Sequence, residues 1–282
     1  MTRWMMVSQA GGAVDDTLAD MTVSAALKMQ AALDYDTMIA MSKSQTALMG
    51  DAGADMSISM EGIDDIPRIF VESMFSAYMN GAVMIDFVKA HGGWDAVGDL
   101  FINPPLSTEQ VLHPEKLIGK RDNPVKIDAT NIVEKVNAFF QDNDDWALVN
   151  HDVMGELGIR IYLNLWQPDD ARNPRSSSVA AEGWGGDRFV YFENRKTEKD
   201  LMIWATVWDS LEHAREFAVA YRLSLRHRFP EIKKVVRERA EGESPFHLFE
   251  VSPGRFLKMS VAQNRVTVVD TTDETAVGFF LD

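Results

Sequence analysis

The string Gly183-Trp184-Gly185-Gly186-Asp187-Arg188 runs directly into Phe189-Val190-Tyr191-Phe192, where a helical pattern gives way to a strand pattern. Two consecutive glycines let a backbone turn tightly or approach another segment closely. We predict that Trp184 is mostly buried where the two halves of the chain meet, because a large ring can anchor a new layer. Arg188 is expected to pair with a carboxylate, and Asp187 to cap or bridge. The alternative is that the string lines a groove and contacts a ligand.

Beyond this string the apolar pattern has the two-residue period of strands. It recurs in Leu201–Val207, His247–Val251, Arg255–Ala262 and Arg265–Asp270. The stretch Leu211–His227 has helical spacing, and Ala276–Leu281 is predicted as a terminal strand.

Before the string the pattern is helical. Pro67 opens the clearest helix, His91-Gly92-Gly93 ends it, and Trp94–Phe101 is predicted as one more short helix. A helix is also expected over Ala129–Phe140. Another is expected over Trp146–Leu165, where apolar residues recur every four positions from Val149 to Leu165.

The predicted fold class is α+β. Residues 1–166 form a mostly helical region, and the polar, Ser-rich residues 167–182 form a linker. Residues 183–282 form a smaller α+β domain with an antiparallel or mixed sheet.

A short elbow is predicted near the middle of the helical region. Asn103-Pro104-Pro105 must be extended, and Ser107 with Gln110 has the spacing of a capping box. Pro114 limits the following helix to about a turn. Ser107 and His113 could suggest a nucleophile and a base, but no Gly-x-Ser-x-Gly elbow surrounds the serine, so a serine triad is not favoured.

Composition restricts the partners. The 282 residues carry 43 acidic and 28 basic side chains, for a net charge of −15. Such a surface repels nucleic acid and attracts cationic peptides or basic proteins. The chain contains no cysteine and no apolar run long enough to span a membrane, so no membrane insertion is expected. Compartment and oligomeric state stay open.

The histidines argue against a zinc hydrolase centre. Helix-borne centres of this kind need His-Glu-x-x-His, and no two of the six histidines are four residues apart. We therefore predict no catalytic residue, no metal ligand and no cofactor in this chain.

Several strings together resemble one family. They are Ile66-Pro67-Arg68, His91-Gly92-Gly93-Trp94, Asn103-Pro104-Pro105-Leu106-Ser107-Thr108-Glu109-Gln110, Leu112-His113-Pro114-Glu115-Lys116, Gly155-Glu156-Leu157-Gly158 and Gly183-Trp184-Gly185-Gly186-Asp187-Arg188. In this order they resemble the C-terminal part of bacterial and archaeal zinc metallopeptidase-like proteins of the gluzincin type, whose domain is zincin-like. The resemblance covers residues 60 to 230 and implies that Ser107, Glu109, Gln110, His113, Glu115, Trp184, Asp187 and Arg188 are cleft or structural residues.

The chain departs from that family in two ways. The His-Glu-x-x-His helix would have to precede Met1, and Leu18 stands where the family carries its third ligand, a glutamate. The chain is then either a C-terminal fragment or a lineage that kept the scaffold without the metal, and zinc is implied only for a full-length member. We expect a non-catalytic cleft scaffold, with a peptide- or protein-binding module as the alternative.

Overall fold

The fold is α+β, as predicted, and is described from a computed structural model. The described residues are 65–141, 145–166, 174–235 and 245–279, together with 24–26, 28–29, 37 and 39–41. Leu18, the position compared with the family's third ligand, lies outside them. The chain divides into two compact units, residues 1–105 with 110–121 and residues 106–109 with 122–282.

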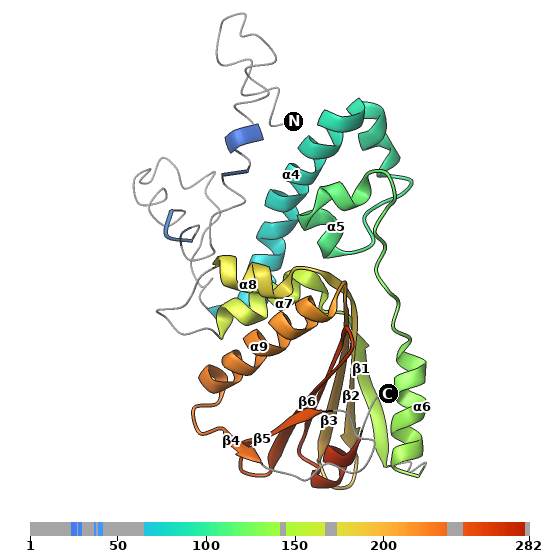
Figure 1. Ribbon diagram of the computed structural model, residues 1–282, viewed down its shortest axis with the longest axis vertical. Coiled ribbons are helices and arrows are strands. Elements are labelled where there is room, and N and C mark those ends of the chain that lie inside the picture. The colour runs from blue at the N-terminus through green and yellow to red at the C-terminus, as the bar shows by residue number, and fades with distance from the viewer. Residues whose placement is uncertain are drawn as a thin grey trace, which may run out of the picture. The chain divides into compact units, whose positions relative to one another are not determined.

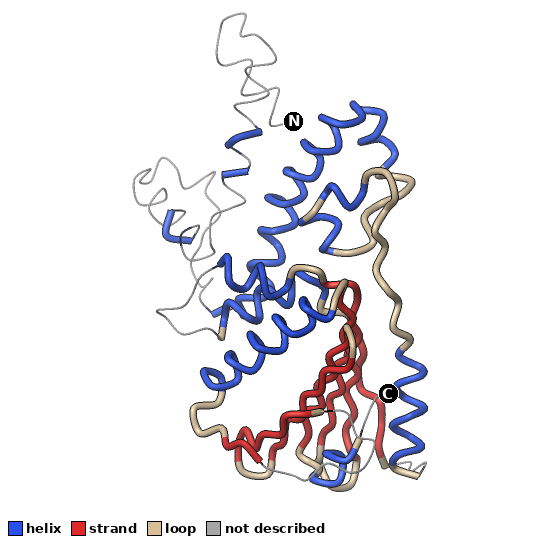
Figure 2. Tube along the Cα trace, viewed as in Figure 1, coloured by secondary structure: helices blue, strands red, loops and turns tan. Residues whose placement is uncertain are grey.

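The second unit is built on one antiparallel sheet of seven strands, in the order β1-β2-β3-β7-β6-β5-β4 (Figures 1 and 2). Its strands are β1 (Trp146–Asp152), β2 (Trp184–Asn194), β3 (Asp200–Trp208), β4 (Lys233–Val235), β5 (Phe246–Ser252), β6 (Arg255–Ala262) and β7 (Arg265–Thr271). Hairpins join β2 to β3, β5 to β6 and β6 to β7. The strands predicted from the two-residue period all lie in this sheet.

Helices cover both faces of the sheet. On one face lie α7 (Gly155–Leu165), α8 (Pro174–Ala181) and α9 (Leu211–Arg228), over a core that contains Trp184, Trp204, Trp208 and Phe217. On the other lies α6 (Ala129–Phe139), where Ile132 and Val136 pack against Trp146, Phe192 and Ile203. Each large side chain is therefore buried between a helix and the sheet, which stabilises both layers.

The first unit contains α4 (Arg68–Asp99), most of α5 (Thr108–Leu112) and the 3-10 helix η3 (Pro114–Leu117). Gly93 interrupts α4 with φ of +67°, so two helices meet there at a kink. This confirms the predicted end at His91-Gly92-Gly93, because a left-handed residue after a helix favours glycine.

The structure differs from the predicted division of the chain. Residues 146–152 are strand β1, not the start of a helix, and they belong with the sheet unit rather than with a helical region that ends at 166. Val149 and Val153 stand four apart, and four is a multiple of the strand period as well as close to a helical turn. The spacing alone could not distinguish the two.

Two further elements differ from expectation. Residues 174–181, predicted as linker, form α8, which starts at Pro174 and buries Ala180 and Ala181. The predicted terminal strand is instead the 3-10 helix η4 (Glu274–Gly278), and Asp273 caps it by accepting from the Thr275 N–H. None of the described helices combines the length and hydropathy that crossing a bilayer requires.

Candidate functional site

Asp187 on β2 is the carboxylate of the predicted string, and it accepts four hydrogen bonds. It is 3% exposed, and its two oxygens accept from the N–H groups of Met154 and Gly155 at the start of α7, each at 2.9 Å. The indole N–H groups of Trp184 and Trp204 also donate to it, again at 2.9 Å. Asp187 therefore caps α7 and bridges β2, β3 and that helix, which is the structural role expected of it.

Trp184 is buried, as predicted, at 2% exposure. It lies in the core beneath α7, α8 and α9. Arg188 differs from expectation: its Nε donates to the carbonyl of Ile127 at 3.2 Å, rather than to a carboxylate. Hydrogen bonds from Thr130 lower the carboxyl pKa of Asp128, and the nearby charge of Arg188 lowers it further.

The two glycines of the string admit a neighbouring segment. The Val125 N–H donates to the Gly185 carbonyl at 2.7 Å. A Cβ at Gly186 would lie 2.3 Å from the Val125 carbonyl oxygen, so no other residue fits there without movement. The extended segment 124–127 thus lies against β2, beyond the point where β1 leaves its pairing with β2 at Asp152. The glycines of the string were predicted to allow a close approach of another segment, and that segment is 124–127.

A pocket of 720 Å³ opens in the fork between segment 124–127 and the end of β1. We call it the fork pocket. Its lining residues come from segment 124–127, the start of α6, the end of β1 and the β2 string, together with Leu106. They are Leu106, Pro124, Val125, Lys126, Ile127, Asp128, Ala129, Thr130, His151, Val153, Trp184, Gly186, Asp187 and Arg188. The half-buried Arg188, with Lys126 and the exposed His151, gives this pocket basic groups in a chain of net charge −15.

Next to the fork pocket, β1 forms an open edge of the sheet. Among the described strands it pairs with β2 alone, and a register shift interrupts that pairing between Leu148 and Asn150. Leu148, Val149 and Val153 are 41%, 55% and 40% exposed. Within the described part of the chain, the outward backbone groups of β1 have no hydrogen-bond partner. Such an edge can accept a further strand.

The predicted elbow residues are divided between the two units: Ser107 and Glu109 belong to the second unit, and Gln110, His113 and Glu115 to the first. Thr108 Oγ1 accepts from the Leu157 N–H at 3.2 Å, and a Cβ at Gly155 would lie only 2.6 Å from it. Thr108 is therefore held closely against the start of α7. Glu109 and Gln110 are buried. His113 Nδ1 lies 3.7 Å from a Glu115 carboxylate oxygen, an ion pair only when the imidazole is protonated. The helix-capping role of Ser107 stays a prediction.

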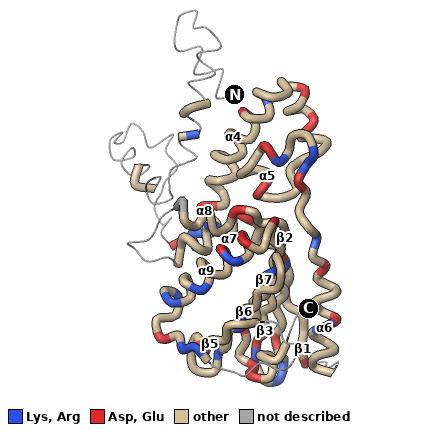
Figure 3. Tube along the Cα trace, in the orientation of Figure 1, with Lys and Arg blue, Asp and Glu red and all other residues tan. Residues whose placement is uncertain are grey.

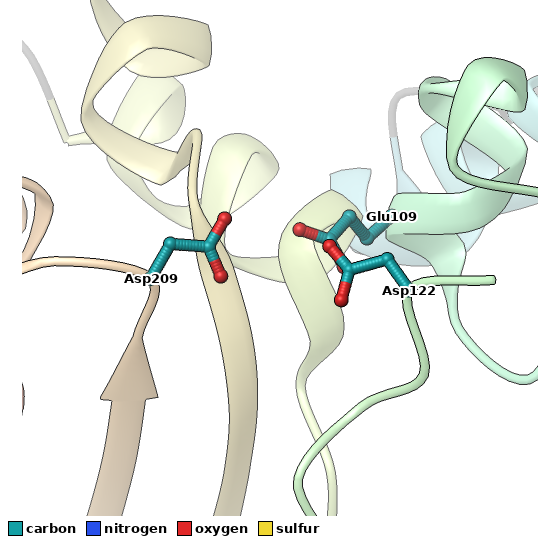
Figure 4. A group of neighbouring side chains, drawn as sticks. All are labelled: Glu109, Asp122 and Asp209. Atoms are coloured by element: carbon teal, nitrogen blue, oxygen red, sulfur yellow. The ribbon is translucent and has the colours of Figure 1, made fainter. Parts of the chain in front are cut away.

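Three carboxylates that the sequence did not group together face one another in the second unit (Figure 4). The ligand oxygens of Glu109, Asp122 and Asp209 all lie within 4.8 Å of one another. Glu109 is buried, and the other two are exposed. An all-oxygen set suits a hard cation such as calcium or magnesium rather than zinc. These residues are far apart in the sequence, so no spacing could have revealed them.

The histidines do not converge on such a site. All six lie in the described part of the chain, and no possible metal-ligand group found there includes a histidine. His213, for example, packs its ring against the backbone of Gly183.

Comparison with known proteins finds one family model that matches part of the chain. Residues 146–278 match DUF8575, a domain of unknown function. The match begins at the first residue of β1 and ends at the last residue of η4, so α6 and segment 124–127 lie outside it. No curated protein gave a match. Among solved structures, the extracellular domain of PknH from Mycobacterium tuberculosis is similar, with 12% identity over 53% of this chain and 88% of that chain and a TM-score of 0.30.

Proposed function

We propose that the chain is a peptide- or protein-binding module, in which an extended segment of the partner pairs with β1 and places an acidic group in the fork pocket. The observation that carries the proposal is the open edge of β1 beside that pocket. Backbone pairing at a sheet edge supplies affinity, and neighbouring pockets supply specificity. Segment 124–127 is an internal example of the same kind of contact, because it bonds to β2 at Gly185.

The acidic group is inferred from the bonding within the pocket. Asp128 already accepts from Thr130, and Asp187 from its four donors. In the described part of the chain, the two terminal nitrogens of Arg188 donate to no acceptor, and only Nε is used. A guanidinium can bind a carboxylate through two parallel hydrogen bonds. Outside the pocket the net charge of −15 favours a neutral or basic partner sequence.

The relationship to zinc metallopeptidases remains a second element of the proposal. If an upstream segment supplies His-Glu-x-x-His, the present residues would shape a substrate cleft rather than hold the metal. By itself this chain should retain no zinc after dialysis against a weak chelator, because its histidines do not converge. One tightly held zinc ion per chain would contradict the non-catalytic assignment.

The binding test uses a displayed library of short random peptides, followed by anisotropy measurements with the selected peptides. Val149→Lys places a charge on the exposed edge, as natural sheets do to block pairing, and should weaken binding at least about tenfold. Arg188→Gln should weaken by roughly 10–100-fold only those peptides that carry an acidic residue. Methylation of alternate peptide amides should also abolish binding, because it removes backbone donors.

The matched control is Val219→Lys, the same substitution at a valine of similar exposure, 48%, on α9. It should leave peptide affinity unchanged. The proposal is wrong if the library yields no binder, or if the selected peptides bind the Val149 and Arg188 variants as tightly as the unaltered chain.

A further inference from the structure

A pocket of 250 Å³ lies within the first unit, beside the kink that Gly93 makes in α4. Its lining comes from α4 on both sides of the kink, from Asn103 after the helix, and from the end of η3 with the residues that follow it. We call it the kink pocket. Pockets for drug-sized ligands have volumes of roughly 300–1,000 Å³, so this one suits a molecule of only a few heavy atoms.

Two glycines shape one wall of the kink pocket. His91 and Gly92 line it before the kink, and Ala96 lines it after the kink. A Cβ at Gly92 would lie 2.5 Å from the Ala96 Cβ, so a larger residue there requires the two helical turns to move apart. Gly93 has a φ of +67°, which other residues rarely adopt. The glycines that divide α4 therefore also keep this wall free of side chains.

The floor of the kink pocket is apolar. Val88 is buried and belongs to the core cluster of the first unit, against which Leu100 and Leu117 pack. Ile118, which is 41% exposed, adds a further apolar side chain to the lining. A small aliphatic group bound here would be removed from water, which is favourable.

Arg121 supplies the pocket with a fixed cation. Its Nη2 donates to the carbonyls of Asn103 at 3.1 Å and Pro104 at 2.7 Å, just after the C-terminal end of α4. In the described part of the chain Nη1 and Nε have no acceptor, and no carboxylate pairs with this side chain. A partly buried guanidinium held in this way is oriented to bind a carboxylate through Nη1.

An anion lines the same pocket. Asp99 is exposed in the last turn of α4, and within the described residues its carboxylate bonds to no group, Arg121 included. Opposite charges that share a pocket without pairing leave room for a ligand that carries both. A plain carboxylate would be repelled by Asp99, and a plain amine by Arg121. Both signs of charge occur along α4 and the residues that follow α5 (Figure 3).

We propose that the kink pocket binds a free α-amino acid with a small aliphatic side chain. The carboxylate of the ligand pairs with Arg121, its ammonium group pairs with Asp99, and its side chain lies on the apolar floor. The site belongs to the first unit alone and is independent of peptide binding at β1.

Isothermal titration calorimetry of the full chain with each of the common protein amino acids tests for this ligand. We expect leucine or a similar aliphatic amino acid to bind. Two analogues then separate the charged groups of leucine, because isocaproate lacks its ammonium group and isoamylamine lacks its carboxylate. Each analogue should bind the unaltered chain at least about tenfold more weakly than leucine.

Two substitutions should change these preferences in opposite ways. Asp99→Asn removes the repulsion of a plain carboxylate, so isocaproate should bind this variant at least as tightly as leucine does. Arg121→Gln should weaken leucine binding at least about tenfold and leave isoamylamine the tighter ligand. The controls are Asp95→Asn, at an exposed aspartate one turn earlier, and Lys120→Gln, at the exposed cation next in sequence. Both controls should leave all three affinities unchanged.

Thermal melting shows whether each variant folds, which matters most for Arg121→Gln because two bonds to backbone carbonyls are lost. Asp99→Asn changes an exposed residue and should melt as the unaltered chain does, so it decides the question even if the arginine variant fails to fold. The proposal is wrong if no amino acid binds, or if isocaproate binds the unaltered chain as tightly as leucine. It is equally wrong if Asp99→Asn leaves the order of the three affinities unchanged.

Discussion

The two edges of the sheet are built differently. β1 has seven residues, exposes Leu148 and Val149, and interrupts its pairing once with a register shift. β4 has three residues, and two of them are the exposed Lys233 and Lys234. Short strands and lysines protect an edge against edge-to-edge pairing, and a bulge is another such protection. The sheet is therefore protected against further strand pairing at β4 and is largely open to it at β1, the edge that adjoins the fork pocket.

The largest effect is expected where β1 ends. Asp187→Leu leaves two backbone N–H groups and two indole N–H groups without an acceptor. Each buried unsatisfied donor costs about 1–3 kcal/mol, so the free energy of unfolding should fall by more than about 4 kcal/mol. Asp187→Asn keeps one acceptor oxygen, so its loss of unfolding free energy should lie between zero and that of the leucine variant. Urea unfolding measures both, and a loss below about 1 kcal/mol for the leucine variant would show that Asp187 does not hold the end of β1.

The centre of the sheet should be the next most sensitive place. Arg255 on β6 donates to Asp270 on β7 at 2.7 Å and to Asp200 on β3 at 3.0 Å. Arg255→Met leaves Asp270 buried without its cation, and the loss should lie near the lower end of about 3–5 kcal/mol because Arg255 is partly exposed. The exposed Arg265→Met on β7 is the control and should change stability by less than about 0.5 kcal/mol.

The Arg255 variant also has a pH signature. Burial raises the pKa of Asp270, and the guanidinium of Arg255 opposes that rise. Without the guanidinium the pKa rises further, so the protonated acid is favoured in the folded state. Stability of the variant should then be lost as the pH rises through the folded-state pKa of Asp270, and Asp270→Asn in the same chain should remove this dependence. A pH profile parallel to that of the unaltered chain would contradict it.

Removing the guard at β4 should change association more than stability. Replacing Lys233 and Lys234 by threonine takes two charges from an exposed strand and should change the free energy of unfolding by less than about 0.5 kcal/mol. Light scattering of the concentrated variant should rise, because a second edge is then open to pairing. If scattering stays unchanged, the lysines are not what guards this edge.

The smallest effect concerns His247 on β5. Partial burial lowers its pKa first, and the charges of Arg222 and Lys234 lower it further. The unfolded state then binds more protons below the unfolded pKa of about 6.5, so stability should rise slightly with pH through that region. In the His247→Gln variant this rise should be absent, as measured by unfolding midpoints at several pH values. A steeper rise in the variant would reverse the sign of the argument.

Local patterns predicted much of the fold. β6 occupies the predicted Arg255–Ala262, α9 and α6 end within one residue of expectation, and Gly93 divides α4 where the glycines indicated. These elements have a clear period and distinct ends. β1 was missed because its four-residue spacing fits two periods. α8 was missed because its serines suggested a linker, although Pro174 is a helix-start signal.

The candidate site was predicted only in part. The burial of Trp184 and the capping by Asp187 follow from residue type and position beside a strand. The partner of Arg188 and the course of segment 124–127 depend on which distant segments meet, and no local pattern contains that information. The same holds for Glu109, Asp122 and Asp209.

Two glycines of the sheet unit also bear on how the domain could be expressed alone. A Cβ at Gly155 would lie 2.6 Å from Thr108 Oγ1, and one at Gly186 would lie 2.3 Å from the Val125 carbonyl oxygen. Thr108 and Val125, the residues that fill the space beside these glycines, both precede Trp146, where the family match begins. A chain cut at that boundary would leave two bare glycine surfaces exposed to water, together with the apolar face on which α6 rests. The shortest piece that keeps this domain intact should therefore start near Leu106, well before Trp146, where the family match begins.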